Sequence, residues 1–241
     1  MADSVSDREQ DSKGVSRLIL GAWIGLLAAV VAIVVPVLAL MITALAPSAF
    51  FSLGTGLLQF SGTLVVVGAV LYIVSLFAYR RAFAALRKAD AEFWFASVLC
   101  LVGSVGFLLI IVAAAVLAGT ASSVLTCVHG APSHVLGCLE SGQPLGAYSA
   151  LVGFACAWVG GVGVVLGLTL SSDRFARRMI AFGALIYLLF LFALLIPFVE
   201  LVAKLPGVGY LLVILPVLSI VGPLLVLAGA RPVALRLGRS A

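Results

Sequence analysis

The stretch TCVHGAPSHVLGC, residues 126–138, gathers four side chains that can bind a metal ion or form a disulfide. It holds two of the chain's four cysteines and both of its histidines. Cys127, His129, His134 and Cys138 together make a two-cysteine, two-histidine set, which suits tetrahedral Zn²⁺. Cu⁺ also accepts soft sulfur ligands. The residue types alone therefore allow a metal site.

A disulfide between Cys127 and Cys138 is the alternative that the spacing favours. Ten residues separate the two cysteines, and closing such a loop contributes on the order of 2–3 kcal/mol. The Cys-x-His spacing is also tighter than the usual separation of paired zinc ligands. We expect the disulfide, and a pair of free thiols or a metal site of all four residues remains open.

A second polar group occurs near the end of an apolar run. Glu200 and Lys204 are four residues apart, which suits an ion pair along a helix, and Glu200 lies about one helical turn after Pro197. The pair either anchors the end of a helix at the membrane surface or lines a cavity that binds a cation or proton. Gln59, near the same side of the membrane, would line that cavity or make an ordinary hydrogen bond between helices.

The elements that carry these residues are predicted from composition. The chain has 241 residues, of which 64% are hydrophobic and 10% charged, whereas soluble domains carry about 25% charged residues. Six apolar runs reach the length of about 20 residues that spans a bilayer as helix. They are residues 18–45, 57–79, 93–118, 147–170, 179–203 and 208–230. We expect an all-α integral membrane bundle of six transmembrane helices.

Lysine and arginine predict how this bundle is oriented. With six spans, 13 of the 14 basic residues fall on one side, in the tails and in links 80–92 and 171–178, and Lys204 alone falls on the other. Basic residues mark the cytoplasmic side. We therefore expect a flexible cytoplasmic tail over 1–17, a transmembrane domain over 18–230 with an outer loop at 119–146, and a basic cytoplasmic tail over 231–241. Thiols outside the cytoplasm tend to oxidise, which again favours the disulfide. The N-terminal stretch is polar and mixed in charge, so we do not expect a signal peptide.

The segment YRRAFAALRK places its basic residues on one helical face. Arg80, Arg81, Arg87 and Lys88 lie opposite a face made by Tyr79, Phe83 and Leu86. A basic face at the end of a span is typical of contact with anionic lipid headgroups. The net charge of +5 therefore describes a membrane surface and not a nucleic-acid footprint. A protein partner or a second copy of the chain is also possible in the membrane plane.

Small residues within the predicted spans indicate packing. GAWIG at 21–25 and GVVLG at 163–167 both match Gly-x-x-x-Gly, which lets two helices approach closely. Cys100 and Cys156 are single thiols in predicted helices, and we expect each to pack as a small core residue.

Reactive groups are scarce in the rest of the sequence. The predicted spans contain no histidine and no pair of carboxylates, and HExxH and a phosphate-binding lysine loop do not occur. We do not expect this chain to be an enzyme or to bind a cofactor. We expect it to be a scaffold or accessory subunit that acts through lipid and protein contacts. A small transporter or channel with a cavity near Glu200 is the alternative, and a metal-handling protein based on the outer loop is the third.

Two segments also resemble a known family. YRRAFAALRKADAEFWFASVLCLVGSVGFLLIIVAAAVLAG is similar to a helix–link–helix region of archaeal polytopic membrane proteins catalogued as domain-of-unknown-function family 973. SSDRFARRMIAFGALIYLLF resembles a later basic link of the same family, and the likeness extends loosely over residues 15–231. The resemblance implies an archaeal membrane protein. It implies no activity and gives the cysteine and histidine loop no role.

Overall fold

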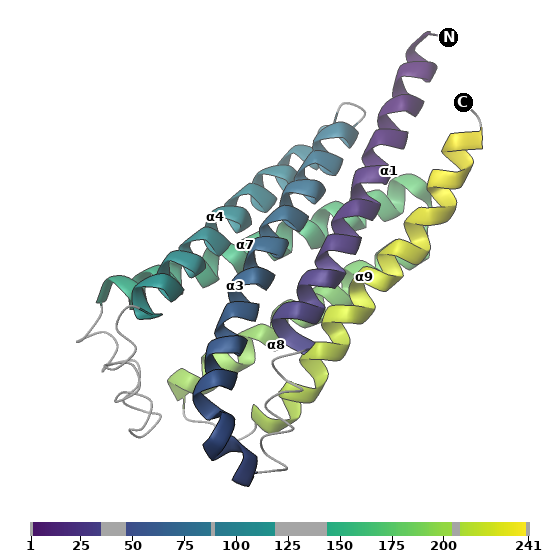
Figure 1. Cartoon of the computed structure of the whole chain (residues 1–241). Coiled ribbons are helices and arrows are strands. Elements are labelled where there is room, and N and C mark those ends of the chain that lie inside the picture. Colours follow the sequence, from purple (N-terminus) through teal and green to yellow (C-terminus); the bar gives the residue numbers. More distant parts are fainter. Residues whose placement is uncertain (1, 35–46, 88–89, 119–143, 204–207, 240–241) are drawn as a thin grey trace.

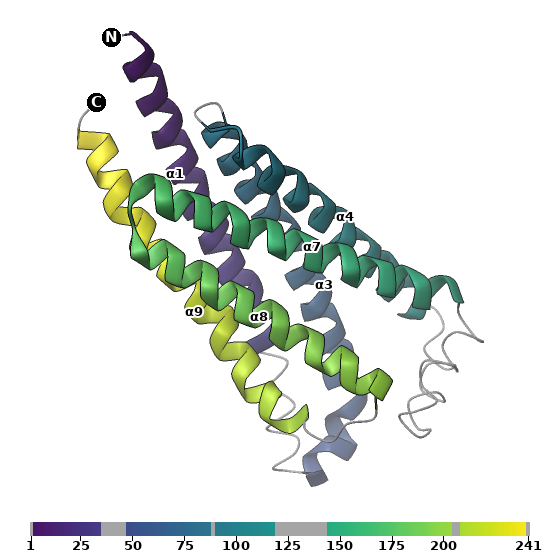
Figure 2. The same cartoon turned by 180° about the vertical axis from the view of Figure 1, so that it is seen from behind.

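The computed structural model describes the chain except for residues 1, 35–46, 88–89, 119–143, 204–207 and 240–241. All regular structure among the described residues is helical, which confirms the all-α prediction. The helices are α1 (Ala2–Ala29), a π-helical turn η1 (Val30–Val34), α3 (Pro47–Leu86), α4 (Phe93–Ala118), α7 (Pro144–Phe175), α8 (Arg178–Ala203) and α9 (Val208–Arg239). Figures 1 and 2 show them as one elongated bundle with both termini at the same end.

The helices follow the predicted apolar runs, but several of them are longer. α4 and α8 lie within one residue of the runs 93–118 and 179–203. α3 continues to Leu86, through much of the predicted link, and α9 continues to Arg239 through the basic tail. An apolar run marks the part of a helix that lies in lipid, and nothing in it stops the helix from continuing into water.

The flexible tail expected over residues 1–17 is wrong. α1 begins at Ala2, so almost the whole tail is helical. Val15 near the end of this polar run and Leu18 directly after it are both fully buried against neighbouring helices. Tertiary packing of these residues stabilises a helix that the polar composition of the segment does not predict.

Neighbouring helices run in opposite directions. α1 packs between α3 and α9, α4 packs along α7, and α8 packs against both α7 and α9. Figure 2 shows α7 crossing the back of the bundle at an angle, so that the pair α4–α7 diverges from α3 toward the end away from the termini. Consecutive α-helices thus run in opposite directions, and their charged ends lie together at one end of the bundle.

A two-residue turn joins α7 to α8. The N–H of Arg177 donates to the carbonyl of Ser172 at 3.0 Å, and the N–H of Ala176 donates to that of Asp173 at 3.3 Å. These two bonds form a Schellman motif, whose central residue must adopt the left-handed conformation. Ala176 does so with φ of 48°. The turn reverses the chain at once and keeps Arg174 and Arg178 at the same end of the bundle.

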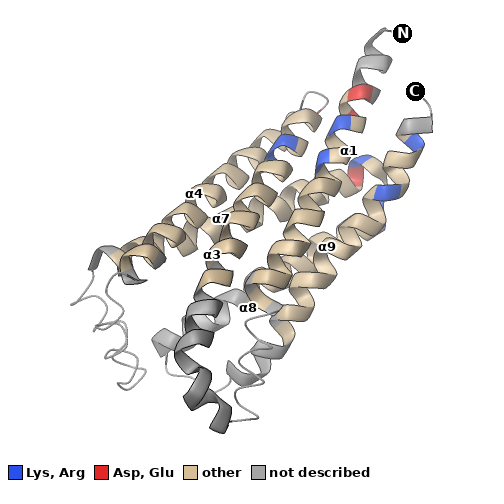
Figure 3. Ribbon diagram, viewed as in Figure 1, with Lys and Arg blue, Asp and Glu red and all other residues tan. Residues whose placement is uncertain are grey.

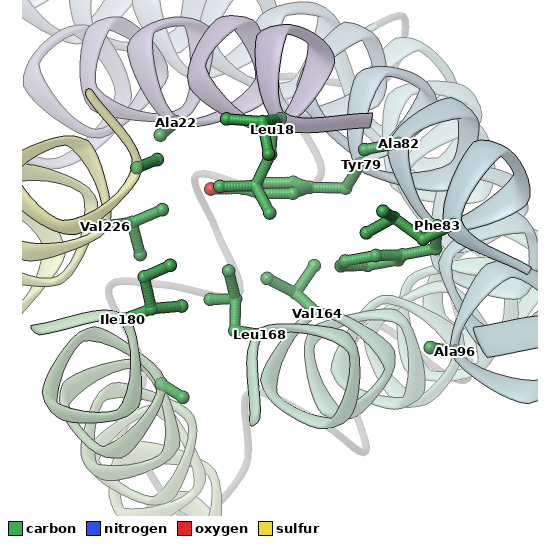
Figure 4. Close-up of a cluster of buried hydrophobic side chains, with 14 of the residues drawn as sticks. Leu18, Ala22, Tyr79, Ala82, Phe83, Ala96, Val164, Leu168, Ile180 and Val226 are labelled. Atoms are coloured by element: carbon green, nitrogen blue, oxygen red, sulfur yellow. The ribbon is translucent and has the colours of Figure 1, made fainter. Parts of the chain in front are cut away.

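The main core lies in the half of the bundle nearer the termini, where every helix contributes to it. Figure 4 shows Tyr79 and Phe83 of α3 facing Val164 and Leu168 of α7, with Leu18 of α1 above them. Tyr79, Phe83 and Leu86 are 1%, 0% and 0% exposed, so the apolar face predicted for YRRAFAALRK is confirmed.

Glycines set the closest helix contacts. The predicted pair at 163–167 packs as expected, since a Cβ on Gly163 would lie 2.6 Å from Cβ of Leu99 and one on Gly167 would lie 2.2 Å from the Phe83 ring. The tightest backbone crossing was not predicted. It joins α4 to α7, where a Cβ on Gly160 would lie 2.3 Å from Cα of Gly103. The two backbones touch here because neither residue has a side chain.

The outside of the bundle is apolar. Large hydrophobic side chains such as Leu108, Phe182 and Phe192 are about half exposed on the described surface. Within the described residues, five helices contain stretches long and apolar enough to cross a membrane, and the described part of α8 adds a shorter apolar stretch. Such a surface and such helices indicate a multi-pass membrane protein.

Candidate functional site

Charged residues gather at one end of the bundle. Figure 3 shows the described lysines, arginines and acidic residues close to the end that carries both termini, while the rest of the described ribbon is uncharged. The groups come from the start of α1 and α8 and from the ends of α3, α7 and α9. Antiparallel packing brings these segments together, although they are far apart in the sequence.

Polar contacts between helices hold this charged end together. The guanidinium of Arg174 donates from Nε to Oδ1 of Asp11 at 3.0 Å and from Nη2 to Oδ2 at 3.2 Å, which ties α7 to α1. Arg17 donates to the carbonyl oxygen of Arg81 at 3.3 Å, which ties α1 to α3. The hydroxyl of Ser97 donates to the carbonyl oxygen of Arg80 at 3.4 Å and ties α4 to α3.

The predicted headgroup arginines border a groove between α3 and α4. We call it the basic groove, and it has a volume of about 390 Å³. It is lined by Arg80, Arg81, Arg87, Trp94, Ser97 and three apolar residues. The structure thus brings Arg80, Arg81 and Arg87 together on one surface, whereas Lys88 lies outside the described residues.

Local structure explains why the groove exists. The carboxylate of Asp90 accepts the N–H of Glu92 at 3.1 Å in the short link between α3 and α4, which reverses the chain. Phe83 stacks on Phe93 across the same hairpin, with ring centroids 6.1 Å apart, and both rings are buried. The packed face of the hairpin therefore leaves the arginines on the other face of α3, beside the half-exposed Trp94.

The basic surface continues past this groove onto α1. A second groove of about 440 Å³ lies between α1 and α3, where Lys13, Arg17 and Arg81 are among the lining residues. Arg81 lines both grooves. Lys13 pairs with Glu9 at 2.6 Å, so its charge is partly compensated. Within the described part of the chain, by contrast, the three arginines of the basic groove take part in no ion pair.

A separate cavity lies inside the bundle, between α3, α4, α7 and α8. We call it the bundle cavity, and its volume is about 250 Å³. Aromatic residues make up much of its lining, namely Tyr72, Tyr79, Phe107, Phe154, Trp158, Tyr187 and Phe190. The hydroxyls of Tyr79 and Tyr187 are 3.4 Å apart, and the hydroxyl of Ser75 donates to the carbonyl of Gly21 at 2.8 Å.

The bundle cavity was not predicted, although the sequence contains a signal for it. Tyr72, Ser75 and Tyr79 occur at helical spacing within an apolar run, so they share one face of α3. Three hydroxyl groups on one face of a transmembrane helix suggest an interior contact. A search for ionisable groups misses this face, because hydroxyls are neutral at ordinary pH.

The remaining predicted site residues cannot be placed. Cys127, His129, His134, Cys138 and Lys204 lie outside the described residues. Glu200 and Gln59 lie in α8 and α3, but their side chains are not described. The disulfide, the metal alternative and the cavity near Glu200 therefore stay predictions.

The described residues contain little other reactive chemistry. No group of three or more histidine, cysteine or acidic residues able to hold a metal occurs among them. Cys100 is fully buried in the main core and Cys156 is half-buried, and neither is bonded to another described cysteine. Cys100 thus packs as a small core residue, as predicted.

Comparisons with known proteins add no further information. No family model, curated protein or solved structure matches the chain. The resemblance to domain-of-unknown-function family 973 therefore stays a prediction, and function has to be argued from the geometry.

Proposed function

We propose that this chain is a six-span membrane protein with both termini in the cytoplasm, which acts as a non-catalytic scaffold or accessory subunit. It would bind anionic lipid through the basic groove and contact a membrane-protein partner or a second copy through its apolar flanks. The observation that carries the proposal is the collection of arginines at one end of an otherwise apolar bundle (Figure 3). The positive-inside rule then favours the cytoplasmic side for that end.

The chemistry of the basic groove fits a phosphate-containing headgroup. A guanidinium donates two parallel N–H bonds to phosphate oxygens, so three arginines offer several such arrangements. Trp94, 51% exposed at the edge of the groove, has the amphipathic character of residues at the membrane interface. A lipid would thus place its phosphate among the arginines and its acyl chains along the apolar residues of α4.

The test measures anionic lipid binding to the purified protein in neutral detergent by native mass spectrometry. Arg80→Gln/Arg81→Gln/Arg87→Gln should weaken binding of phosphatidylglycerol by about 100-fold, because each arginine contributes about 1 kcal/mol, or roughly fivefold, near an anionic surface. The matched control is Arg177→Gln/Arg178→Gln/Arg236→Gln, which removes equal charge at the same end but outside the groove. We expect it to weaken binding less than about threefold, since salt screens more distant charges. Equal losses in the two variants would contradict a specific groove.

Transport is the second candidate function, and the bundle cavity is the observation that favours it. A cavity between helices near the middle of a bundle is typical of transporters. Proteoliposomes carrying the wild type would then pass a small cation or proton faster than protein-free vesicles, and Ala69→Phe, which places a ring in the bundle cavity, would slow that flux. Flux equal to that of protein-free vesicles would exclude this candidate.

A further inference from the structure

We propose that the bundle cavity is a binding site for a lipid-soluble quinone, held by its flat ring system and one carbonyl oxygen. Three observations carry the proposal: the size of the cavity, the aromatic walls and the hydroxyl groups at one place in the lining. This site is separate from the basic groove and does not depend on lipid headgroup binding.

The size fits a fused pair of rings. An apolar cavity of about 150 Å³ in another protein binds benzene. The bundle cavity, at about 250 Å³, is larger by roughly the volume of a second ring. It therefore suits the ring system of a naphthoquinone, whose tail would leave through the open side of the cavity.

The walls favour a flat ring over an acyl chain. Tyr72 of α3 and Phe107 of α4 stack with centroids 5.4 Å apart and planes 6° from parallel, which makes an ordered aromatic wall. Trp158 of α7 also lines the cavity. Aromatic faces attract a planar, electron-poor ring by offset stacking, and a flexible acyl chain gains no such contact.

The hydroxyls favour a carbonyl group on that ring. Tyr79 and Tyr187 lie 3.4 Å apart, so one hydroxyl can donate to the other and the second proton is left for another acceptor. Ser75 has already donated its proton to Gly21, and Trp158 donates its N–H to the carbonyl of Leu191 at 3.2 Å. The tyrosine pair therefore has a proton to donate beside the stacked Tyr72 ring, and a quinone carbonyl accepts it.

The experiment uses Trp158 as the reporter of binding. In a Trp23→Phe/Trp94→Phe background Trp158 is the remaining tryptophan. Menadione, a methylated naphthoquinone, is titrated into the purified protein, and we expect saturable quenching of the fluorescence. Tyr79→Phe/Tyr187→Phe keeps both rings, and it should weaken menadione binding about tenfold because it removes the hydrogen bond to the carbonyl.

Two controls separate ring binding from carbonyl recognition. Naphthalene has the same rings without carbonyls, so its own affinity should be equal in the presence and absence of the two hydroxyls. Ala69→Phe places a ring in the cavity, since Ala69 lines it, and should abolish saturable quenching. A thermal unfolding scan of each variant verifies that it is folded. Quenching that rises linearly and equally in all folded variants, or unchanged menadione affinity without the hydroxyls, would overturn the proposal.

Discussion

The charged end and the apolar middle of this bundle hold their helices together in different ways. At the charged end, hydrogen bonds and ion pairs join helices that are far apart in the chain, as between Asp11 and Arg174. In the middle, backbones touch at glycines, as between Gly103 and Gly160, and the neighbouring space is left as a cavity. In lipid, apolar area gives little driving force for association, so shape decides the packing there. At the aqueous end, directional polar contacts can set the register.

The largest effect on stability should come from a substitution at the glycine crossing in the middle of the bundle. Gly160→Leu would put a side chain where the backbone of Gly103 lies, so α4 and α7 must separate or bend. We expect a loss of about 3 kcal/mol of stability, measured by thermal unfolding in detergent. Gly222→Ala is the control, because the three atoms nearest to its Cβ would be side-chain atoms of Tyr187 and Ile186, at 3.3 Å or more. Equal stability of the two variants would show that the crossing is looser than described.

The next largest effect on stability should come from the predicted outer loop, which follows the end of α4 away from the charged end. If Cys127 and Cys138 form a disulfide there, Cys127→Ser/Cys138→Ser should lower stability by about 2–3 kcal/mol. A membrane-impermeant maleimide should label these two thiols in intact cells only after reduction, while Cys100 stays unlabelled in its buried position. Labelling without reduction would argue against the disulfide, and bound zinc in the purified protein would support the metal alternative.

Substitutions in the Asp11–Arg174 pair test how much the charged end contributes to the free energy of unfolding. Its side chains are 18% and 24% exposed, and the geometry is bidentate, so we expect a coupling of about 1 kcal/mol. A double-mutant cycle with Asp11→Asn and Arg174→Gln isolates that value. The Glu9–Lys13 pair, with side chains 66% and 60% exposed, is the control and should show much weaker coupling. The reverse order would mean that exposure does not decide the strength of these pairs.

The smallest effect is a gain in stability at the turn between α7 and α8. Ala176 adopts a left-handed conformation, which costs a residue with a Cβ about 1 kcal/mol relative to glycine. Ala176→Gly should therefore raise stability by about 0.5–1 kcal/mol. Ala181→Gly, in the exposed first turns of α8, should lower it. If both substitutions destabilise the protein, the strain at Ala176 is not limiting.

Much of the fold could be predicted from particular residues. The run from Phe93 to Ala118 contains no charged residue and follows a polar link, and α4 has those bounds. Tyr79, Phe83 and Leu86 share a helical face at the end of α3, and that face is buried. The helix over residues 2–17 was harder to predict, because a single buried residue such as Val15 in a polar run does not indicate a helix until the neighbouring helices are known. Of the candidate sites, the arginines of the basic groove were predicted as a group, but their joint groove with Trp94 was not.

The amino-acid sequence by itself determined which segments are helical and apolar enough to cross a membrane, because spanning helices must satisfy their backbone internally over a set length. It also determined that basic residues fall at alternate links. Only the tertiary structure decided that α4 and α7 cross at Gly103 and Gly160, that Tyr79 meets Tyr187, and that a cavity lies beside them. The physical reason is that the contact between two apolar helices depends on the shapes of both surfaces together, and neither helix encodes that fit alone.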